Sequence, residues 1–318
     1  FDKIILFTLV IYYYLFVIQC SNIMKNLIIG ASGKIGSYLI SKDINNIYTY
    51  NSNKINNGIK FDILKDSISK IIKNNNVANV VFLGAISDPN ICYKRKEFSR
   101  KINVEKTIKI IDYLNKNRIY FIFFSSEFIY GGDKRYSKET DKTNPINEYG
   151  KQKLEVENYI KQNSDFYSIF RIGKTYGNKI DDGTLVSGFL KDLKCNKKKF
   201  SVANDQFFSP LYVMDLKKII YFFIKHKITG IYNVGGLKRL SRFEILSYIR
   251  AKLKKKLRKK IVLNKKKLVS FKFYDKRPKD VSMNINKLKK TINFKLSKFE
   301  KVSLKIIKKS RINEIKFT

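Results

Sequence analysis

Three glycines, each separated from the next by two residues, follow the first short apolar segment after residue 24. Leu27-Ile-Ile29 has the composition of a buried strand, and Gly30-Ala-Ser-Gly33-Lys-Ile-Gly36 follows it directly. Glycines between a strand and a helix let the backbone turn tightly and approach a pyrophosphate at the helix N-terminus. We therefore expect a strand–turn–helix unit here. Its helix should run to about Ser41, and its turn should be able to hold the phosphates of a ligand.

The segments that follow alternate between strand-like and helix-like patterns. Short continuous apolar runs predict buried strands, and runs with a period of about 3.6 residues predict helices. Strands are expected at residues 47–50, 77–83, 119–124, 167–171 and 230–234, and helices at residues 63–73, 98–114, 149–161, 185–193, 216–225 and 241–253. Strands that alternate with helices form a parallel sheet that is covered on both faces.

The chain of 318 residues is long enough for one large core or for a domain with an additional lobe. The alternation loosens beyond about Gly173. The prediction is therefore an α/β fold: a Rossmann-like, doubly wound parallel sheet over residues 24–172 and a smaller C-terminal lobe over residues 173–318, partly interleaved with it. Ligands of open α/β sheets bind at the carboxyl ends of the strands, so we expect the lobe to cover these ends and bind the substrate.

The first 23 residues require a separate interpretation. An apolar run from Ile4 to Ile18 is short for a membrane span, which needs about 20 residues, and has the length of a signal-peptide core. Met24 stands immediately before the first predicted strand. We expect residues 1–23 to be translated upstream sequence, with a signal or membrane anchor as the alternative. Apart from that alternative, no membrane association is expected.

Composition narrows the class of protein. The 66 basic and 26 acidic residues give a formal charge of +40, which favours anionic partners. Because the lysines are spread along the chain, we expect a solvated surface rather than a nucleic-acid site; the positive field would attract a sugar diphosphate and a phosphorylated dinucleotide. Cys20, Cys92 and Cys195 have no paired spacing and His226 is the only histidine. We therefore expect no disulfide framework, no metal site and a reducing, cytoplasmic setting.

Tyr149 and Lys153 are separated by four residues at the start of a predicted helix, so both side chains lie on one helix face. A nearby ammonium favours the phenolate and should lower the pKa of Tyr149 towards the working pH. Ser126, at the end of an apolar strand, could hydrogen-bond the same carbonyl or alcohol oxygen. These three side chains predict a catalytic site that transfers a proton while a nicotinamide gives or takes a hydride.

The end of the second strand bears on the choice of cofactor. An acidic residue at this point binds the adenosine ribose diol of NAD and repels the 2′-phosphate of NADP. The segment Tyr50-Asn-Ser-Asn-Lys54 has no acid, so Asn51 and Ser52 favour NADP(H) over NAD(H). Asp62 is placed either to reach the adenine or to cap a helix, and the sequence leaves both interpretations open.

Five further motifs resemble those of the extended short-chain dehydrogenase/reductase family, and most closely its dTDP-4-dehydrorhamnose reductase branch. The resemblance extends from Met24 to about Lys289. It is carried by Phe124-Ser-Ser-Glu-Phe-Ile-Tyr-Gly-Gly132, Asn144-Pro-Ile-Asn-Glu-Tyr-Gly-Lys-Gln-Lys153, Asn204-Asp-Gln-Phe-Phe-Ser-Pro210, Arg277-Pro278 and Asn103-Val104.

The resemblance implies NAD(P)H-dependent reduction of a nucleotide-linked 4-keto-6-deoxy sugar. The hydride goes to C4, Tyr149 protonates the oxygen, Lys153 tunes Tyr149 and holds the nicotinamide ribose, and Ser126 orients the carbonyl. A homodimer is compatible with it. The cofactor site that it implies comprises Gly30, Ser32, Gly33, Lys34, Ile35, Gly36, Asn51, Ser52, Asp62, Ile63, Gly84, Ala85, Asn103, Tyr149, Lys153 and Ile172. The substrate site comprises Ser126, Glu127, Lys174 and Gln206.

Three departures from the reductase pattern leave other functions open. Glu127 replaces an aspartate, Lys174 stands where the reductases place a bulky aromatic, and Tyr212-Val-Met-Asp215 is more similar to nucleotide-sugar epimerases. An epimerase or dehydratase is one alternative, although dehydratases have an acidic pair beside the catalytic serine or threonine and only Glu127 occurs here. A non-catalytic, cofactor-binding regulatory subunit is the other; the intact Ser126, Tyr149 and Lys153 argue against it.

Overall fold

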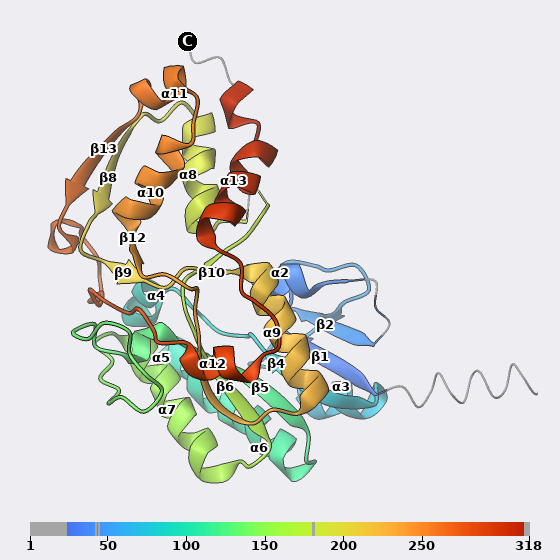
Figure 1. Cartoon of the computed structure of the whole chain (residues 1–318). Helices are drawn as coiled ribbons and strands as arrows, with labels where there is room; N and C mark the ends of the chain where they lie inside the picture. The colour runs from blue at the N-terminus through green and yellow to red at the C-terminus, as the bar shows by residue number, and fades with distance from the viewer. Residues whose placement is uncertain (1–23, 42, 44, 180–181, 315–318) are drawn as a thin grey trace, which may run out of the picture.

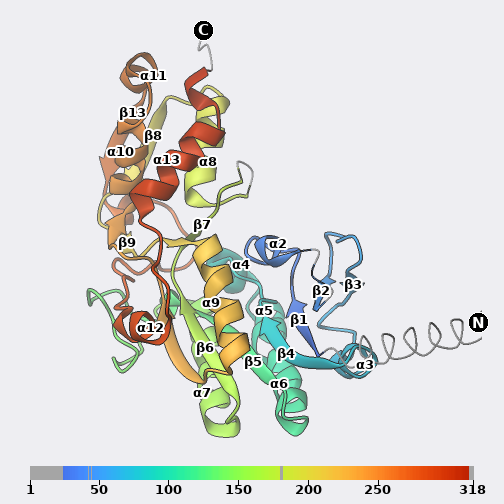
Figure 2. The same ribbon diagram turned by 45° about the vertical axis from the view of Figure 1, so that its right-hand side comes forward.

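A computed structural model describes residues 24–41, 43, 45–179 and 182–314. The expectation for residues 1–23 therefore lies outside the described residues. Within the described ranges, no helix has both the length and the apolar character needed to cross a membrane. Figures 1 and 2 show a sheet with helices on both faces and a second, smaller lobe above one end of it.

The sheet contains seven parallel strands among the described residues, as expected from the alternation. They are β1 (Lys25–Ile29), β2 (Asn46–Tyr50), β3 (Ile59–Lys60), β4 (Val77–Phe82), β5 (Tyr120–Ser126), β6 (Tyr167–Ile172) and β11 (Gly230–Val234). Their order in space is β11-β6-β5-β4-β1-β2-β3. The chain runs outward in one direction from β1 and in the other from β4, so the strand order reverses between these two strands. In such sheets ligands bind in the crevice at this point of reversal.

Helices cover each face of the sheet through a separate apolar cluster. On one face, α3 (Ile68–Asn74), α6 (Thr107–Lys116) and α7 (Glu148–Asn163) pack against the strands. On the other face lie α2 (Gly36–Leu39), α9 (Val213–His226) and α12 (Asn286–Thr291). All seven residues of β5 are buried, because helices cover this central strand on both sides. This double burial explains why its sequence is a continuous apolar run.

The C-terminal lobe has its own core. It contains α8 (Leu185–Lys194), α10 (Arg242–Ala251), α11 (Lys255–Lys260), α13 (Phe299–Lys309) and the parallel pair β8 (Lys199–Ala203) and β13 (Val262–Lys266). Helix α10 begins at a capping box in which the Ser241 hydroxyl accepts from the Glu244 amide and the Glu244 carboxylate accepts from the Ser241 amide. Such a box satisfies two amides that a helix start leaves unpaired.

Short strand pairs join the lobe to the sheet. β7 (Thr175–Tyr176) pairs with β10 (Leu211–Tyr212), and β9 (Phe207–Phe208) pairs with β12 (Leu240–Ser241). After β10 the chain leaves the lobe, forms α9 and β11 on the sheet, and then returns. The segment 230–234, which lies in the range predicted for a lobe partly interleaved with the sheet domain, thus joins the sheet, where β11 pairs with the edge of β6 along five residues.

Three predicted helices differ from the structure. The helix after the glycine turn ends at Leu39 rather than Ser41 and has four residues. The helix expected at residues 63–73 begins only at Ile68, because Asp62 accepts a hydrogen bond from the Leu64 amide and closes a turn there. The helix predicted at residues 98–114 is a continuous stretch made of α5 (Lys96–Arg100), a π-helical segment η1 (Lys101–Lys106) and α6.

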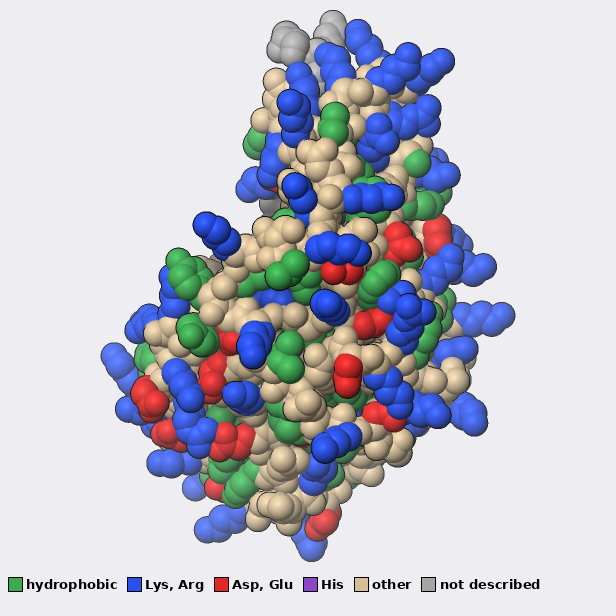
Figure 3. All heavy atoms as spheres, turned by 90° about the vertical axis from the view of Figure 1, so that its left-hand side faces the viewer, with side chains coloured by type: hydrophobic (Ala, Val, Ile, Leu, Met, Phe, Trp, Pro, Cys, Tyr) green, Lys and Arg blue, Asp and Glu red, His purple; other side chains and the backbone are tan. Residues whose placement is uncertain are grey.

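Positive charge is distributed over the surface. Figure 3 shows lysine and arginine side chains across the whole of one face and acidic side chains mainly below the upper lobe. No acidic residue occurs between Arg250 and Lys267, the segment that forms α11 and β13.

Candidate active site

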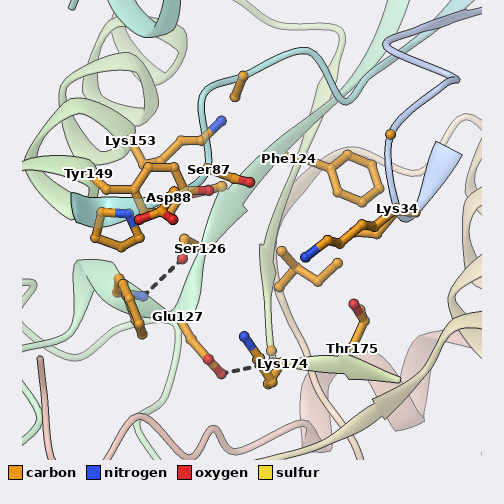
Figure 4. A pocket seen from close by; sticks show the side chains of 18 of the residues that line it. Lys34, Ser87, Asp88, Phe124, Ser126, Glu127, Tyr149, Lys153, Lys174 and Thr175 are labelled. Atoms are coloured by element: carbon orange, nitrogen blue, oxygen red, sulfur yellow. Dashed lines mark hydrogen bonds between the residues drawn. The ribbon is translucent and has the colours of Figure 1, made fainter. Parts of the chain in front are cut away.

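A cavity of about 660 Å³ lies at the carboxyl ends of the central strands, between the sheet and the lobe. The glycine turn after β1, the segments after β4, β5 and β6, the start of α7 and the lobe all contribute to its walls. Figure 4 shows Lys34, Ser126, Tyr149, Lys153 and Lys174 directed into this one space. The structure thus brings together the predicted catalytic trio, part of the predicted cofactor site and the predicted substrate residues.

The glycine turn has the shape required for a backbone cradle. Gly30 has a φ of +80° and lies so close to Gly84 that a β-carbon on Gly30 would be 3.0 Å from the Gly84 nitrogen. A β-carbon on Gly36 would be 2.5 Å from the α-carbon of Ala31. Only glycine fits at both positions. Because α2 is short, its dipole is small; the turn amides and the Lys34 ammonium are the groups that would hold the phosphates of a dinucleotide.

Helix α7 brings Tyr149 and Lys153 to the cavity. It begins at Asn147, whose side-chain oxygen accepts a hydrogen bond of 2.8 Å from the Gly150 amide, and Asp275 accepts another of 2.8 Å from the Glu148 amide. These two caps fix the first turn, in which Tyr149 lies. Lys153 follows one turn later, with its Nζ 5.9 Å from the centre of the Tyr149 ring. Ser126 comes from the end of β5, and its hydroxyl accepts from the Phe128 amide.

Burial controls the ionisation of this pair. It raises the pKa of Tyr149 well above its usual value, with the nearby Cys92 adding to the rise and hydrogen bonding to Ser126 opposing it. The expected lowering of the pKa of Tyr149 by Lys153 is therefore not found in this structure, because burial dominates. The same burial lowers the pKa of Lys153 to about 8. At neutral pH the phenol keeps its proton.

Glu127 and Lys174 form a second ionisable pair next to Ser126. The Glu127 carboxylate is 5% exposed and accepts a hydrogen bond of 3.1 Å from the Lys174 amide. Burial raises the pKa of Glu127, while burial and the nearby Arg242 lower the pKa of Lys174. Gln206, also predicted, lines the cavity and accepts from the Nε of Arg242 at 2.8 Å.

Several predicted cofactor residues lie outside the cavity wall. They are Ser32, Asn51, Ser52, Asp62, Ile63, Gly84 and Asn103. Asn51 and Ser52 are exposed at the end of β2. Asp62 closes a turn before α3 and does not cap this helix, since the N-cap of α3 is Ser67. The buried Asn103 exchanges hydrogen bonds with the backbone of Ile86 and donates to Gln152. It supports the loop after β4 rather than reaching the cavity.

Other cavity residues were not predicted from the sequence. Arg242, Arg277, Asp88 and Phe273 line the cavity. Asp88 caps α4 (Pro89–Lys94), and Arg277 donates to Asn90 at 2.7 Å. Arg277 belongs to a motif that the sequence had singled out; Arg242 had no such indication, since its segment reads as an ordinary helix start. With Lys34, Lys153 and Lys174, the two arginines make the cavity strongly positive.

The sequence model of the RmlD substrate binding domain family matches residues 24–312. The chain belongs to this family. It is thereby a member of the extended short-chain dehydrogenases/reductases, as its motifs predicted, and the seven-stranded parallel sheet confirms the predicted fold class.

Solved structures of similar proteins support this assignment. A hypothetical dTDP-4-dehydrorhamnose reductase from Sulfolobus tokodaii is 27% identical, with 88% of this chain and 99% of that chain covered and a TM-score of 0.74. The dTDP-4-dehydrorhamnose reductase from Bacillus anthracis, solved in complex with NADP, is 21% identical, with 90% and 99% coverage and a TM-score of 0.76. Nucleotide-sugar epimerases are among the similar folds as well.

A relative of another kind is methionine adenosyltransferase 2 subunit beta from Xenopus tropicalis, which is 24% identical over 173 residues. These residues make up 52% of this chain and 52% of the relative. The chain thus spans about half the length of the curated relatives of this kind that it matches. Other relatives are named as enzymes: a dTDP-4-dehydrorhamnose reductase from Salmonella typhimurium is 28% identical over 115 residues, which make up 36% of this chain and 38% of that reductase.

Proposed function

We propose that this protein reduces the keto group of a nucleotide-linked 4-keto sugar with NAD(P)H. The observation that carries the proposal is the convergence of Ser126, Tyr149 and Lys153 at one end of a cavity whose other end is the glycine turn. Family membership and the similar reductases support the same reaction class. The 4-keto-6-deoxy sugar implied by the sequence motifs is the first substrate to test.

The residues divide the work of the reaction between them. A reduced nicotinamide, when bound, supplies the hydride to C4. Ser126 donates a hydrogen bond to the ketone oxygen and orients it, and Tyr149 gives that oxygen its proton, so the ketone gains a hydride and a proton and becomes an alcohol. Because burial keeps the Tyr149 phenol protonated, it is in the state that reduction needs. The Lys153 ammonium stabilises the phenolate that remains.

NADP(H) is the favoured cofactor within this proposal. Asn51, Ser52 and Lys54 are exposed after β2, and no acid stands there to repel a 2′-phosphate. Lys34 would hold the pyrophosphate, since its side chain lines the cavity beside the glycine turn. Dissociation constants for NADPH and NADH, measured by titration, test this preference; tighter binding of NADH would contradict it.

The decisive experiment follows NADPH oxidation with dTDP-4-keto-6-deoxyglucose and the epimerase that precedes the reductase. Tyr149→Phe should lower kcat by about 10²- to 10⁴-fold, the usual contribution of a general acid, while NADPH still binds. Tyr159→Phe is the matched control, because Tyr159 lies on the same helix and its hydroxyl donates to Asp112 on the surface. Measurable and equal NADPH oxidation by the wild type and Tyr149→Phe, with this or any other nucleotide-linked 4-keto sugar, would contradict the proposed mechanism.

A second candidate is a cofactor-binding regulatory subunit. The similarity to methionine adenosyltransferase 2 subunit beta favours it. Binding of NADPH without oxidation, for every nucleotide keto sugar tried, would move the assignment to this candidate. An epimerase would instead retain its cofactor and interconvert sugars without net oxidation.

A further inference from the structure

The Lys174 ammonium is a cation in the cavity that the proposed reaction does not use. Its side chain is enclosed by the walls of the cavity, and much of its surface is open to the cavity itself. Within the described ranges, the Lys174 side chain forms no ion pair and donates no hydrogen bond; only its backbone amide is held, by Glu127. The neighbouring Arg242, Lys34 and Arg277 all disfavour its positive charge. The site therefore contains a cation whose neighbours in the protein are mostly other cations.

Glu127 offsets this charge only in part. It favours the Lys174 charge, but its carboxyl group is buried, burial raises its pKa, and its hydrogen bond goes to the Lys174 amide rather than to the ammonium. The same carboxyl group accepts the Lys174 amide and thereby fixes the backbone from which the lysine side chain enters the cavity. Asp88, the other acid in the cavity wall, accepts the Asn90 amide as a helix cap.

A bound sugar would exclude water from this end of the cavity. An ammonium that loses its hydration without gaining an anionic partner costs several kcal/mol or shifts to its neutral form. A methyl or hydroxyl group of the sugar opposite Lys174 would not compensate the ammonium for its lost hydration, whereas a carboxylate would.

The position of Lys174 indicates which part of the substrate lies there. Its amide is bonded to Glu127, which directly follows Ser126 in the chain, so Lys174 lies at the reacting end of the cavity. In a hexose, C6 is attached to C5, the ring carbon next to the reacting C4. The nucleotide diphosphate is attached to C1, on the opposite side of the ring. Arg242 and Arg277, which also line the cavity, are cations that could bind this diphosphate.

We propose that the nucleotide sugar carries a carboxylate on C5, the ring carbon next to its reacting C4, and that Lys174 binds this carboxylate. The substrate class is thus a nucleotide-linked uronic acid rather than a 6-deoxy sugar. The inference rests on the proposed function and deepens it by specifying the C5 substituent.

Calorimetric titration of the NADP⁺-loaded protein with stable sugar nucleotides tests this. UDP-glucuronic acid and UDP-glucose differ only at C6, and the corresponding dTDP pair covers the other pyrimidine base. We expect the uronic acid to bind about 10- to 100-fold more tightly, the equivalent of one charge-assisted hydrogen bond. Lys174→Met should remove this preference and leave the affinity for the neutral sugar nearly unchanged.

Lys179→Met serves as the matched control for general electrostatic attraction. Lys179 is an exposed lysine packed over the Tyr38 ring and is not part of the cavity wall. This variant should keep the preference for the uronic acid.

The other outcomes separate the two proposals. Equal affinity of the wild type for both sugars overturns the carboxylate assignment and leaves the reductase intact. If Lys174→Met loses affinity for both sugars to a similar extent, Lys174 binds the diphosphate that they share, and the carboxylate assignment is overturned. Failure of both pairs to bind overturns the proposed function together with this inference.

Discussion

Burial changes the pKa of both Tyr149, whose phenol is neutral at neutral pH, and Lys153, whose ammonium is charged. It raises the pKa of the phenol and lowers the pKa of the ammonium, because a low-dielectric environment disfavours the charged form of each. At neutral pH the phenol therefore keeps its proton and the ammonium keeps its charge, so the phenol has a proton to donate and a cation stands beside the phenolate that remains. The chemistry therefore depends on how deeply α7 places these residues, as well as on their spacing.

The first prediction concerns pH. The pKa of Lys153 is lowered to about 8, so in the free enzyme its ammonium loses its proton as the pH rises through that value. Stabilisation of the Tyr149 phenolate is lost with it, and kcat/KM should fall above about pH 8. Steady-state rates across the alkaline range measure this.

The control for this prediction is Lys174→Met. The pKa of Lys174 is lowered too, so its removal shows which lysine causes the decline. The decline should persist in Lys174→Met. A profile that stays flat until the ordinary lysine pKa of about 10.4 would contradict the role of Lys153.

At the scale of elements, the turn between β1 and α2 leaves no room for a side chain. The added β-carbon of Gly36→Ala would lie 2.5 Å from the α-carbon and 2.6 Å from the carbonyl oxygen of Ala31. Both neighbours are backbone atoms, so the turn itself would have to move. Overpacking of this kind costs about 1 to 3 kcal/mol, and the cradle for the dinucleotide would change shape.

Gly36→Ala should accordingly lower the free energy of unfolding and weaken NADPH binding. Gly188→Ala is the control, since a β-carbon on Gly188, inside α8, meets no atom within 4 Å. Alanine is favoured over glycine in a helix by up to about 1 kcal/mol, so this variant should be neutral or stabilised. Urea unfolding and NADPH titration give both quantities; unchanged binding in Gly36→Ala would show that the turn is not the cofactor site.

At the scale of the whole molecule, a buried polar network joins β6, α7 and β11 with two loop segments. The Arg171 guanidinium on β6 pairs with Glu157 of α7 at 2.9 Å and donates to the Tyr130 hydroxyl at 3.0 Å. Tyr130 in turn donates to Asn233 on β11, whose amide reaches the backbone at Ser137 and Asn284. Segments that are far apart in the sequence are thus joined around one charge pair.

Removing one member of this pair leaves the other charge buried without its partner. Glu157→Gln should therefore lower the free energy of unfolding by about 3 to 5 kcal/mol. Glu155→Gln, on the same helix, is the control: its carboxylate is 43% exposed and pairs with Arg100 at the surface, where such pairs contribute at most about 1 kcal/mol. Urea unfolding measures both variants. Equal decreases in the free energy of unfolding would show that the buried ion pair stabilises the fold no more than the surface ion pair does.

Much of this architecture could be predicted from local sequence patterns. The continuous apolar runs of β4 and β5, the glycine turn, and the four-residue spacing of Tyr149 and Lys153 each depend on neighbours in the chain. The start of α3 was mispredicted, because the hydrogen bonds of Asp62 and its neighbours outweigh apolar periodicity there. The helix after the glycine turn was predicted two residues too long, since α2 ends at Leu39.

The sequence by itself determined the α/β class, the strand-end position of Ser126 and the shared helix face of Tyr149 and Lys153, since these follow from period and spacing. Only the tertiary structure decided that β11 joins the sheet and that Arg242 and Arg277 enter the cavity with Lys174. It also decided that burial, rather than the neighbouring ammonium, controls the pKa of Tyr149. These outcomes depend on which distant segments pack together and how much water they exclude, and no local pattern encodes either.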